Sequence, residues 1–328
     1  MRTTELGRTG QQVSQLALGA MLMGTSTDEV TSFRILDAYL DAGGDFVDTA
    51  DCYAWWPAPG LTGGESETTL GRWFARGGRR DRVFLSTKGS AWVADPDAGR
   101  ASGRPRYDGA GGDTLRHALD GSLRRLGIDH VDLYYVHVDD LATPLEETLS
   151  TLADLVAAGK IRYLGWSNVR TWRLERILGL CERHGWPAPV ALQQQHSYLR
   201  PKAGANVLSI VDAEQLDHLR HNPSVSLVAY SPMLKGIYDD PAKRAGHQAM
   251  VDYEGADVDA RLAVLNELAG DLDVRPNQLV LAWLLHQTDP TPIPLVGPRT
   301  FEQYEAAVSA LDIKLTDEQL TRLDTAGA

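Results

Sequence analysis

The chain has 328 residues, and its 43% hydrophobic fraction is enough for a large buried core. Disordered and fibrous proteins are therefore excluded. The net charge is −12, from 32 Lys and Arg against 44 Asp and Glu, and the basic residues form no run. We therefore expect neither nucleic acids nor anionic membrane surfaces as partners.

The two cysteines, Cys52 and Cys181, lie far apart and form no CxxC pair. They fit a reducing compartment and indicate neither a redox motif nor a zinc site. His218 and His221 have a metal-like spacing, but no further ligands accompany them, so we expect solvated side chains and no metal. The start of the chain lacks an apolar signal segment, and no apolar run is long enough to span a membrane. A cytoplasmic location is expected.

The opening LGRTGQQVSQLAL predicts a β-hairpin, because two short runs flank Arg-Thr-Gly. Strand-like and helix-like segments alternate after it. The expected strands are short, apolar and poor in charge, as in a sheet buried on both faces; they are Leu16–Gly19, Phe46–Asp48, Val83–Thr87, Val131–His137, Arg162–Trp166, Val190–Gln193, Ser226–Tyr230 and Pro292–Val296. The helical patterns between them are Asp28–Ala42, Glu65–Arg76, Asp113–Leu126, Pro144–Ala158, Thr171–Arg183, Val207–Arg220 and Pro276–Gln287. Further helices are expected at Ala260–Ala269, Phe301–Leu311 and Asp317–Ala326.

Eight βα units in this order indicate a parallel sheet with helical crossovers. The rival arrangement, an open doubly wound sheet, binds dinucleotides at a GxGxxG turn after a strand, and no such turn occurs. We therefore expect an α/β fold, a (β/α)8 TIM barrel over residues 1–328, with an N-terminal β-hairpin and extra helices near the C-terminus. The longest irregular segments, Ala54–Gly64, Ser90–Gly112 and Leu234–Asp259, all follow strands, so they belong to the face where barrel active sites lie.

Four polar residues fall at this face. Asp48, Lys88 and His137 end strands, and Tyr53 lies in the loop after Asp48. Together they suit the reduction of a carbonyl, which needs a hydride at carbon and a proton at oxygen. Tyr53 can donate the proton, and we expect the Lys88 ammonium to lower the phenol pKa from about 10. Asp48 can hold Lys88 in place, and His137 can orient the carbonyl.

From end to end, the chain resembles the aldo-keto reductases, in the branch that begins with an LGRTGxxVSxLxLG hairpin. The matching segments are LGRTGQQVSQLALG, DAGGDFVDTADCY, GESETTLGRWF, RVFLSTK, SLRRLGIDHVDLYYVH, GKIRYLGWSN and VAYSPM. The resemblance implies NAD(P)H-dependent reduction of an aldehyde, ketone or sugar carbonyl to an alcohol. It also implies an intact catalytic tetrad with Tyr53 as general acid, made of Asp48, Tyr53, Lys88 and His137.

The resemblance assigns cofactor contacts as well. Those expected at the nicotinamide are Ser167, Asn168, Gln193, Tyr230 and Ser231, with the Tyr230 ring stacked on the cofactor ring. Those expected at the adenosine end are Gly297, Arg299, Thr300 and Gln303, where a loop leads into a helix. This chain lacks the Lys-Ser pair and second Arg frequent in the family there, and Ala306 or Ala307 replaces the usual Asn. Arg299 can pair with a 2′-phosphate, so NADP is favoured over NAD.

Trp55, Trp56 and Trp92 lie in loops after strands and are candidate walls of a pocket for a small carbonyl compound. Packing that anchors the loops is the alternative. Arg104 and Arg106 are expected to face water. The sequence identifies neither the carbonyl compound nor the oligomeric state.

Other functions stay open. The same residues suit an alcohol or sugar dehydrogenase working in reverse, and a non-catalytic cofactor-binding regulatory subunit would also keep the tetrad. A metal- or phosphosugar-dependent lyase or isomerase would need acidic clusters at the strand ends, where only Asp48 is clear. The YxxxK pattern of Tyr198 and Lys202 does not indicate a short-chain dehydrogenase, because Pro201 interrupts the helix which that motif requires.

Overall fold

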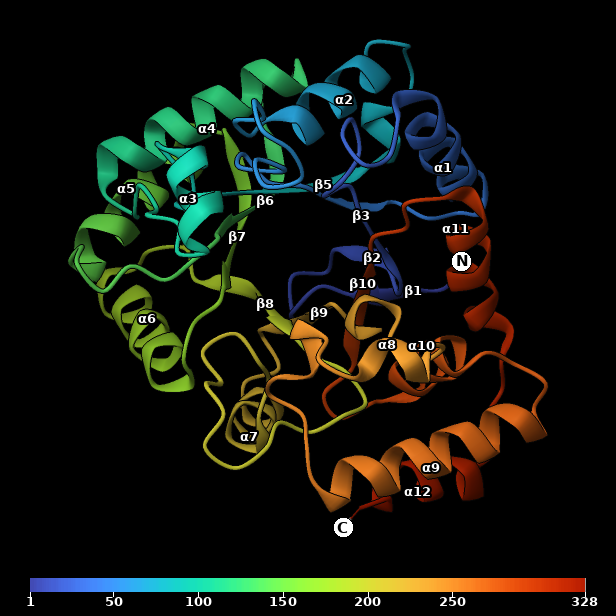
Figure 1. Cartoon of the computed structure of the whole chain (residues 1–328). Helices are drawn as coiled ribbons and strands as arrows, with labels where there is room; N and C mark the ends of the chain where they lie inside the picture. The colour runs from blue at the N-terminus through green and yellow to red at the C-terminus, as the bar shows by residue number, and fades with distance from the viewer. Residues whose placement is uncertain (328) are drawn as a thin grey trace.

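The computed structural model describes residues 1–327, and its centre is a closed barrel of eight parallel strands. The order around the barrel is β10-β3-β4-β5-β6-β7-β8-β9. Figure 1 looks along the barrel, with the strands as an inner ring and the helices outside them. The strands are β3 (Ala17–Gly19), β4 (Phe46–Asp48), β5 (Phe84–Gly89), β6 (Val131–Val136), β7 (Ile161–Ser167), β8 (Pro189–Gln195), β9 (Ser226–Tyr230) and β10 (Pro292–Val296). The predicted TIM barrel is confirmed.

The helices between strands cover the barrel because each presents one apolar stripe to it. In α4 the stripe is Leu115, Leu119, Leu123 and Leu126, all buried, and the helix ends at Gly127 with a left-handed φ of 68°. The covering helices are α1 (Glu29–Asp41), α2 (Glu65–Phe74), α4 (Gly112–Leu126), α5 (Leu145–Ala157), α6 (Thr171–His184), α7 (Ala213–His221), α10 (Pro276–His286) and α11 (Phe301–Ser309).

The predicted start of α7 at Val207 is wrong, since the helix begins at Ala213. The preceding segment pairs with the end of β8 instead: the Gln195 backbone N–H donates to the Ser209 carbonyl at 2.8 Å, and Val211 N–H donates to the Gln195 carbonyl at 2.9 Å. Asp212 then caps the helix by accepting from the Gln215 backbone N–H at 2.9 Å. A non-local pairing therefore overrides the local helical pattern.

The predicted N-terminal hairpin is confirmed as β1 (Thr3–Glu5) paired antiparallel with β2 (Gln12–Ser14). Leu6 and Val13 are fully buried and pack on the side chains that fill the barrel interior, so the hairpin closes one end of the barrel. Gly7 allows this close approach: its φ is 57°, and a Cβ at this position would lie 2.4 Å from the carbonyl oxygen of Ser224.

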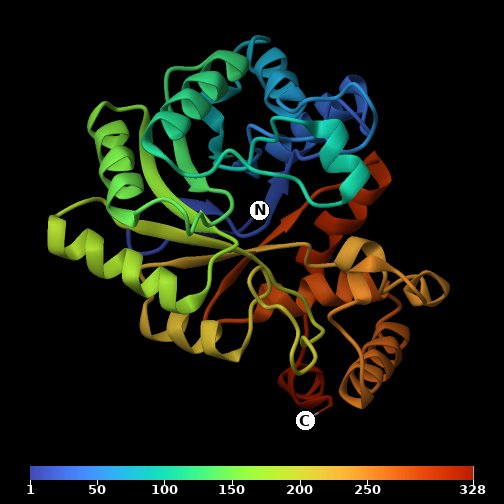
Figure 2. The same ribbon diagram turned by 60° about the vertical axis from the view of Figure 1, so that its left-hand side comes forward.

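Two helices stand outside the ring of covering helices. They are α9 (Ala256–Asp271) and α12 (Asp317–Thr325), which lie side by side (Figures 1 and 2). Arg261 of α9 is buried beneath them and donates to the backbone carbonyls of Tyr198 and Ala326 at 2.8 and 3.0 Å. The predicted extra helices near the C-terminus are confirmed, and α9 is longer than predicted.

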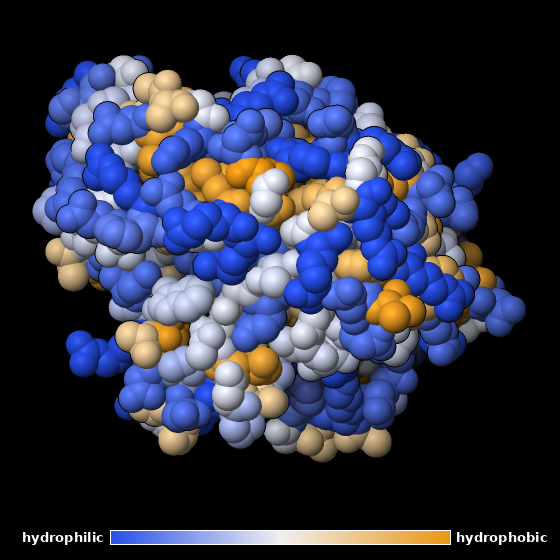
Figure 3. All heavy atoms as spheres, turned by 90° about the horizontal axis from the view of Figure 1, so that it is seen from above, coloured by the Kyte–Doolittle hydropathy of each residue, from blue (hydrophilic) through white to orange (hydrophobic). Residues whose placement is uncertain are grey.

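Two segments predicted to be irregular contain short helices, α3 (Pro96–Ser102) and α8 (Pro241–Arg244). Each helix begins with Pro directly after an Asp cap. The Asp95 and Asp240 side chains accept hydrogen bonds from backbone N–H groups of the first turn. Within residues 1–327, no helix combines the length and the apolar character needed to cross a membrane. The face seen in Figure 3 is mostly hydrophilic, with apolar side chains in separate patches.

Candidate active site

Strand alternation directs one set of polar side chains into the barrel. On β5, the side chain of Phe84 belongs to the cluster inside the barrel, and that of Leu85 to the layer between strands and helices. Side chains alternate along a strand, so Lys88, four positions after Phe84, also points into the barrel. On β4, Asp48 lies two positions after the interior residue Phe46 and points inward as well. The same alternation directs four more side chains into the barrel: His137 after β6, Ser167 on β7, Gln193 on β8 and Tyr230 on β9. The residues predicted from different strand ends therefore meet at one end of the barrel.

Asp48 and Lys88 form a buried ion pair at the base of this site. Lys88 Nζ donates to Asp48 Oδ2 at 2.6 Å, and the two side chains are 0% and 2% exposed. Asp48 Oδ1 accepts from Ser86 Oγ at 2.6 Å and from Gln193 Nε2 at 2.9 Å. Lys88 Nζ also donates to the Thr49 carbonyl at 2.7 Å. The two charges compensate each other, and the additional hydrogen bonds hold both groups in place.

Tyr53 lies directly above this pair. Lys88 Nζ donates to its hydroxyl at 3.2 Å and lies 4.7 Å from the centre of its ring. Burial first, and then the Asp48 carboxylate, raise the pKa of Tyr53 well above its ordinary value of 10.0. The expectation that this pKa lies below its ordinary value is therefore wrong, because burial and the Asp48 carboxylate disfavour the phenolate. The hydroxyl keeps its proton at neutral pH.

His137 stands beside Tyr53, with the ring centroids 5.4 Å apart and the planes at 82°. Its backbone N–H donates to the Gly89 carbonyl at 2.9 Å and to Ser90 Oγ at 3.1 Å, which ties it to the end of β5. Burial, and secondarily the Lys88 ammonium, lower the pKa of His137 well below 6.5. The imidazole is therefore neutral at pH 7.

A layer of amide and hydroxyl groups continues the site across β7, β8 and β9. Ser167 Oγ donates to the Gln193 carbonyl at 2.7 Å, and Asn168 Nδ2 donates to the His137 carbonyl at 2.7 Å. The Tyr230 hydroxyl donates to Asn168 Oδ1 at 2.9 Å. Ser231 follows with a left-handed φ of 51°. These groups offer both donors and acceptors beside the tetrad.

The loop after β10 carries the other predicted cofactor residues. Thr300 caps α11, since its Oγ1 accepts from the Gln303 backbone N–H at 3.2 Å. The Gln303 side chain in turn accepts from the Arg299 backbone N–H at 2.8 Å. Arg299 itself is exposed, as is Gly297. The side chains of Thr300 and Gln303 thus shape the loop, while the Arg299 side chain lies at the surface.

Comparison with known proteins agrees with this geometry. Residues 15–328 match the aldo/keto reductase family. The chain belongs to the aldo/keto reductase family. It is an oxidoreductase by that membership, and the predicted family is confirmed.

Three similar proteins cover nearly the whole chain. "Uncharacterized oxidoreductase YrpG" of Bacillus subtilis (strain 168) is 34% identical over 99% of this chain and 95% of its own length. "Aldo-keto reductase yakc [NADP(+)]" of Schizosaccharomyces pombe is 30% identical over 90% of this chain and 82% of its own. A crystal structure of the thermostable aldo-keto reductase Tm1743 with the inhibitor epalrestat is 26% identical, with a TM-score of 0.72 and 99% of each chain covered.

The three tryptophans expected at the substrate pocket of this aldo/keto reductase occupy different places. Trp56 is 36% exposed and packs edge to face on Tyr53, with centroids 5.9 Å apart. Trp55 is 8% exposed and packs in the loop cluster with Cys52 and Ala91, which anchors the loop. Trp92 packs on the same loop cluster, lies 5.5 Å from the Arg125 guanidinium and lines a cavity of about 460 Å³ together with Asp51. Of the three, Trp56 is the one that makes an edge-to-face ring contact with Tyr53.

Two contacts of the tetrad were missed by sequence reasoning. Ser86 bonds to Asp48, and it was available from the sequence because it lies two positions before Lys88 and so shares its inward parity. Cys52 Sγ lies 3.6 Å from His137 Nδ1, a contact across 85 positions that has no local signal. Arg104 and Arg106 are exposed, as expected.

Proposed function

We propose that this oxidoreductase reduces an aldehyde, ketone or sugar carbonyl to an alcohol, with NADPH as the hydride donor and Tyr53 as the general acid. The observation that carries the proposal is the contact of Tyr53 Oη with Lys88 Nζ at 3.2 Å, backed by the buried Asp48 carboxylate and flanked by His137. One end of the barrel therefore combines a protonated phenol, a fixed cation and a neutral imidazole. These groups can donate a proton to a carbonyl oxygen, stabilise the resulting phenolate and orient the substrate.

The residues around the tetrad suit a nicotinamide cofactor. The carboxamide of nicotinamide needs both hydrogen-bond donors and acceptors, and the hydroxyl and amides of Ser167, Asn168 and Gln193 supply both. The partly exposed ring of Tyr230 would stack on the nicotinamide, with its hydroxyl held by Asn168. Ser231, the next residue, would also contact the nicotinamide. A reduced nicotinamide, when bound, supplies the hydride.

The protein's own residues bind the carbonyl and deliver the proton. His137 donates a hydrogen bond to the carbonyl oxygen and directs it toward Tyr53. As hydride reaches the carbon, Tyr53 Oη releases its proton to the oxygen and becomes a phenolate. Lys88 Nζ stabilises this new negative charge, and Asp48 holds Lys88 in position. Solvent returns a proton to Tyr53 after the alcohol leaves, and oxidation of an alcohol would use the same residues in reverse.

The choice of NADP over NAD rests on Arg299. Its exposed guanidinium belongs to the loop that leads into α11, where backbone N–H groups at a helix start favour anions. A planar cation there suits a 2′-phosphate, which NADP has and NAD lacks. The Schizosaccharomyces pombe relative carries NADP(+) in its name. Gly297, Thr300 and Gln303 would shape the site around the adenosine end.

The test combines cofactor titration with a tetrad variant. NADPH and NADH are titrated while cofactor fluorescence is followed, and a panel of aldehydes, ketones and sugars is then added. Tyr53→Phe keeps the ring but removes the proton, so we expect turnover to fall by roughly 10²–10⁴-fold with NADPH affinity unchanged. Near-normal turnover in Tyr53→Phe would remove Tyr53 as the acid, and failure of the wild-type protein to bind either cofactor would overturn the proposal.

A further inference from the structure

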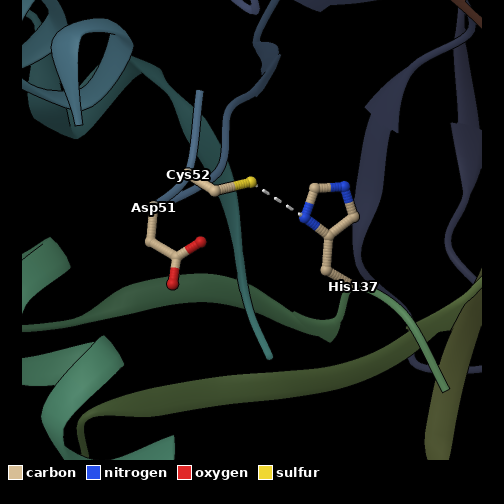
Figure 4. A group of neighbouring side chains, drawn as sticks. All are labelled: Asp51, Cys52 and His137. Atoms are coloured by element: carbon tan, nitrogen blue, oxygen red, sulfur yellow. Dashed lines mark hydrogen bonds between the residues drawn. The ribbon is translucent and has the colours of Figure 1, made fainter. Parts of the chain in front are cut away.

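A buried thiol lies against one nitrogen of the His137 imidazole. Cys52 Sγ lies 3.6 Å from His137 Nδ1, within the range of a sulfur hydrogen bond, and Cys52 is 3% exposed. Figure 4 shows the thiol directed at this nitrogen, while the second ring nitrogen, Nε2, points away from Cys52. The contact joins the loop after β4 to the end of β6.

The two protonation states allow the thiol to be the donor of this hydrogen bond. Burial raises the pKa of the Cys52 thiol well above 9.0, with the Asp51 carboxyl adding to the effect, so the sulfur keeps its proton. His137 is neutral, so one ring nitrogen carries a proton and the other accepts. If S–H is the donor, Nδ1 is the acceptor and the imidazole proton resides on Nε2.

The other groups around the imidazole do not reverse this assignment. The Lys88 ammonium repels a second proton on the ring, and Tyr53 meets the ring edge to face. Asn168 Nδ2 bonds to the backbone carbonyl of His137 and not to the ring. Asp51 is 1% exposed, and among residues 1–327 neither of its carboxyl oxygens has a hydrogen-bond partner. Asp51 therefore does not accept a proton from Nδ1.

We propose that Cys52 is a positioning residue that holds His137 in the tautomer with the proton on Nε2, so that His137 can donate to the substrate carbonyl. The catalytic consequence rests on the proposed function, because the Nε2 proton matters for catalysis only if the substrate presents a carbonyl oxygen that accepts it. The tautomer itself does not depend on any substrate.

The direct test is NMR of the protein with ¹⁵N-labelled histidine. The chain has 9 histidines, so the His137 signals are assigned by their loss in His137→Gln. The deprotonated ring nitrogen resonates far downfield of the protonated one, which identifies the tautomer. We expect Nε2–H in the wild type and in Cys52→Ser, whose hydroxyl can also donate, and a mixture of tautomers in Cys52→Ala.

Kinetics give the second readout. Loss of one hydrogen bond of ordinary strength lowers a rate constant about three- to tenfold, so we expect kcat of Cys52→Ala to fall by that factor. Cysteine-to-serine substitution should restore most of it, and NADPH affinity should not change in either variant. Cys181→Ala is the matched control, since Cys181 is also a buried free thiol but lies in α6. Asp51→Asn should leave the tautomer as it is in the wild type.

Three results would overturn the inference. A proton on Nδ1 in the wild type would reverse the hydrogen bond, and an unchanged tautomer in Cys52→Ala would show that the thiol does not set it. Asp51, Cys52 and His137 also present ligand atoms within 4.8 Å of one another, so Co²⁺ is added to the wild type and to Cys52→Ser. A thiolate-to-cobalt absorption band that is lost in Cys52→Ser would assign the contact to a metal site instead. If no carbonyl is reduced, the proposed function fails, but the NMR result still decides the tautomer.

Discussion

Replacement of Lys88 by Met would leave the Asp48 carboxylate buried without its cation. The pair is 0% and 2% exposed with Nζ and Oδ2 2.6 Å apart, so water cannot replace the ammonium. Removal of one partner of such a pair typically costs about 3–5 kcal/mol. Asp48 keeps its hydrogen bonds from Ser86 and Gln193, so we expect a loss near 3 kcal/mol in the free energy of unfolding.

The double variant Lys88→Met/Asp48→Asn tests whether charge is the cause. The Asn amide is neutral, so no uncompensated charge remains, and we expect its stability within about 1–2 kcal/mol of the wild type. Urea unfolding at pH 7, followed by circular dichroism with a check that the m-value is unchanged, measures both variants.

A loss below about 1 kcal/mol in Lys88→Met would refute this reasoning, because breaking a buried ion pair ordinarily costs more. A double variant no more stable than the single one would also refute it, since the cost would then come from lost packing. Both variants should lack reductase activity, so stability and catalysis are separated by comparing them with Tyr53→Phe, which keeps the ion pair.

Three further outcomes are expected. Arg299→Ala should weaken NADPH binding about tenfold with little effect on NADH, measured by fluorescence titration, and equal losses for the two cofactors would mean that Arg299 does not bind the 2′-phosphate. Trp56→Ala should raise KM for aromatic carbonyls about threefold to tenfold with kcat nearly unchanged, and an unchanged KM would place the substrate elsewhere. Burial and the Arg261 guanidinium lower the pKa of His196 from 6.5 to about 4. Between pH 6.5 and 4, His196 is therefore protonated in the unfolded chain but stays neutral in the folded protein. The free energy of unfolding should fall by at most about 3 kcal/mol over this range. His196→Asn should flatten urea-unfolding stability over this range, and an unchanged pH dependence would exclude His196 as a source.

Much of the fold and the site was predictable from local patterns. The bounds of β4, β9 and β10 agree with the apolar runs, because a strand buried on both faces has a continuous apolar signature. The places of Asp48, Lys88 and His137 at strand ends, and of Tyr53 in the loop after Asp48, predicted that they share one face of the barrel. The opening hairpin followed from its turn residues.

What the sequence by itself determined, then, is the order of strands and helices, the family, and which polar side chains face the barrel. The tertiary structure decided the properties that depend on neighbours distant in the chain. It raised the pKa of Tyr53, because burial and then the nearby Asp48 carboxylate disfavour the phenolate. It also placed Cys52 against His137 and packed Trp92 on the loop cluster that contains Cys52 and Trp55. Periodicity is a local property of the chain, whereas burial and electrostatic contacts arise only when distant segments pack together.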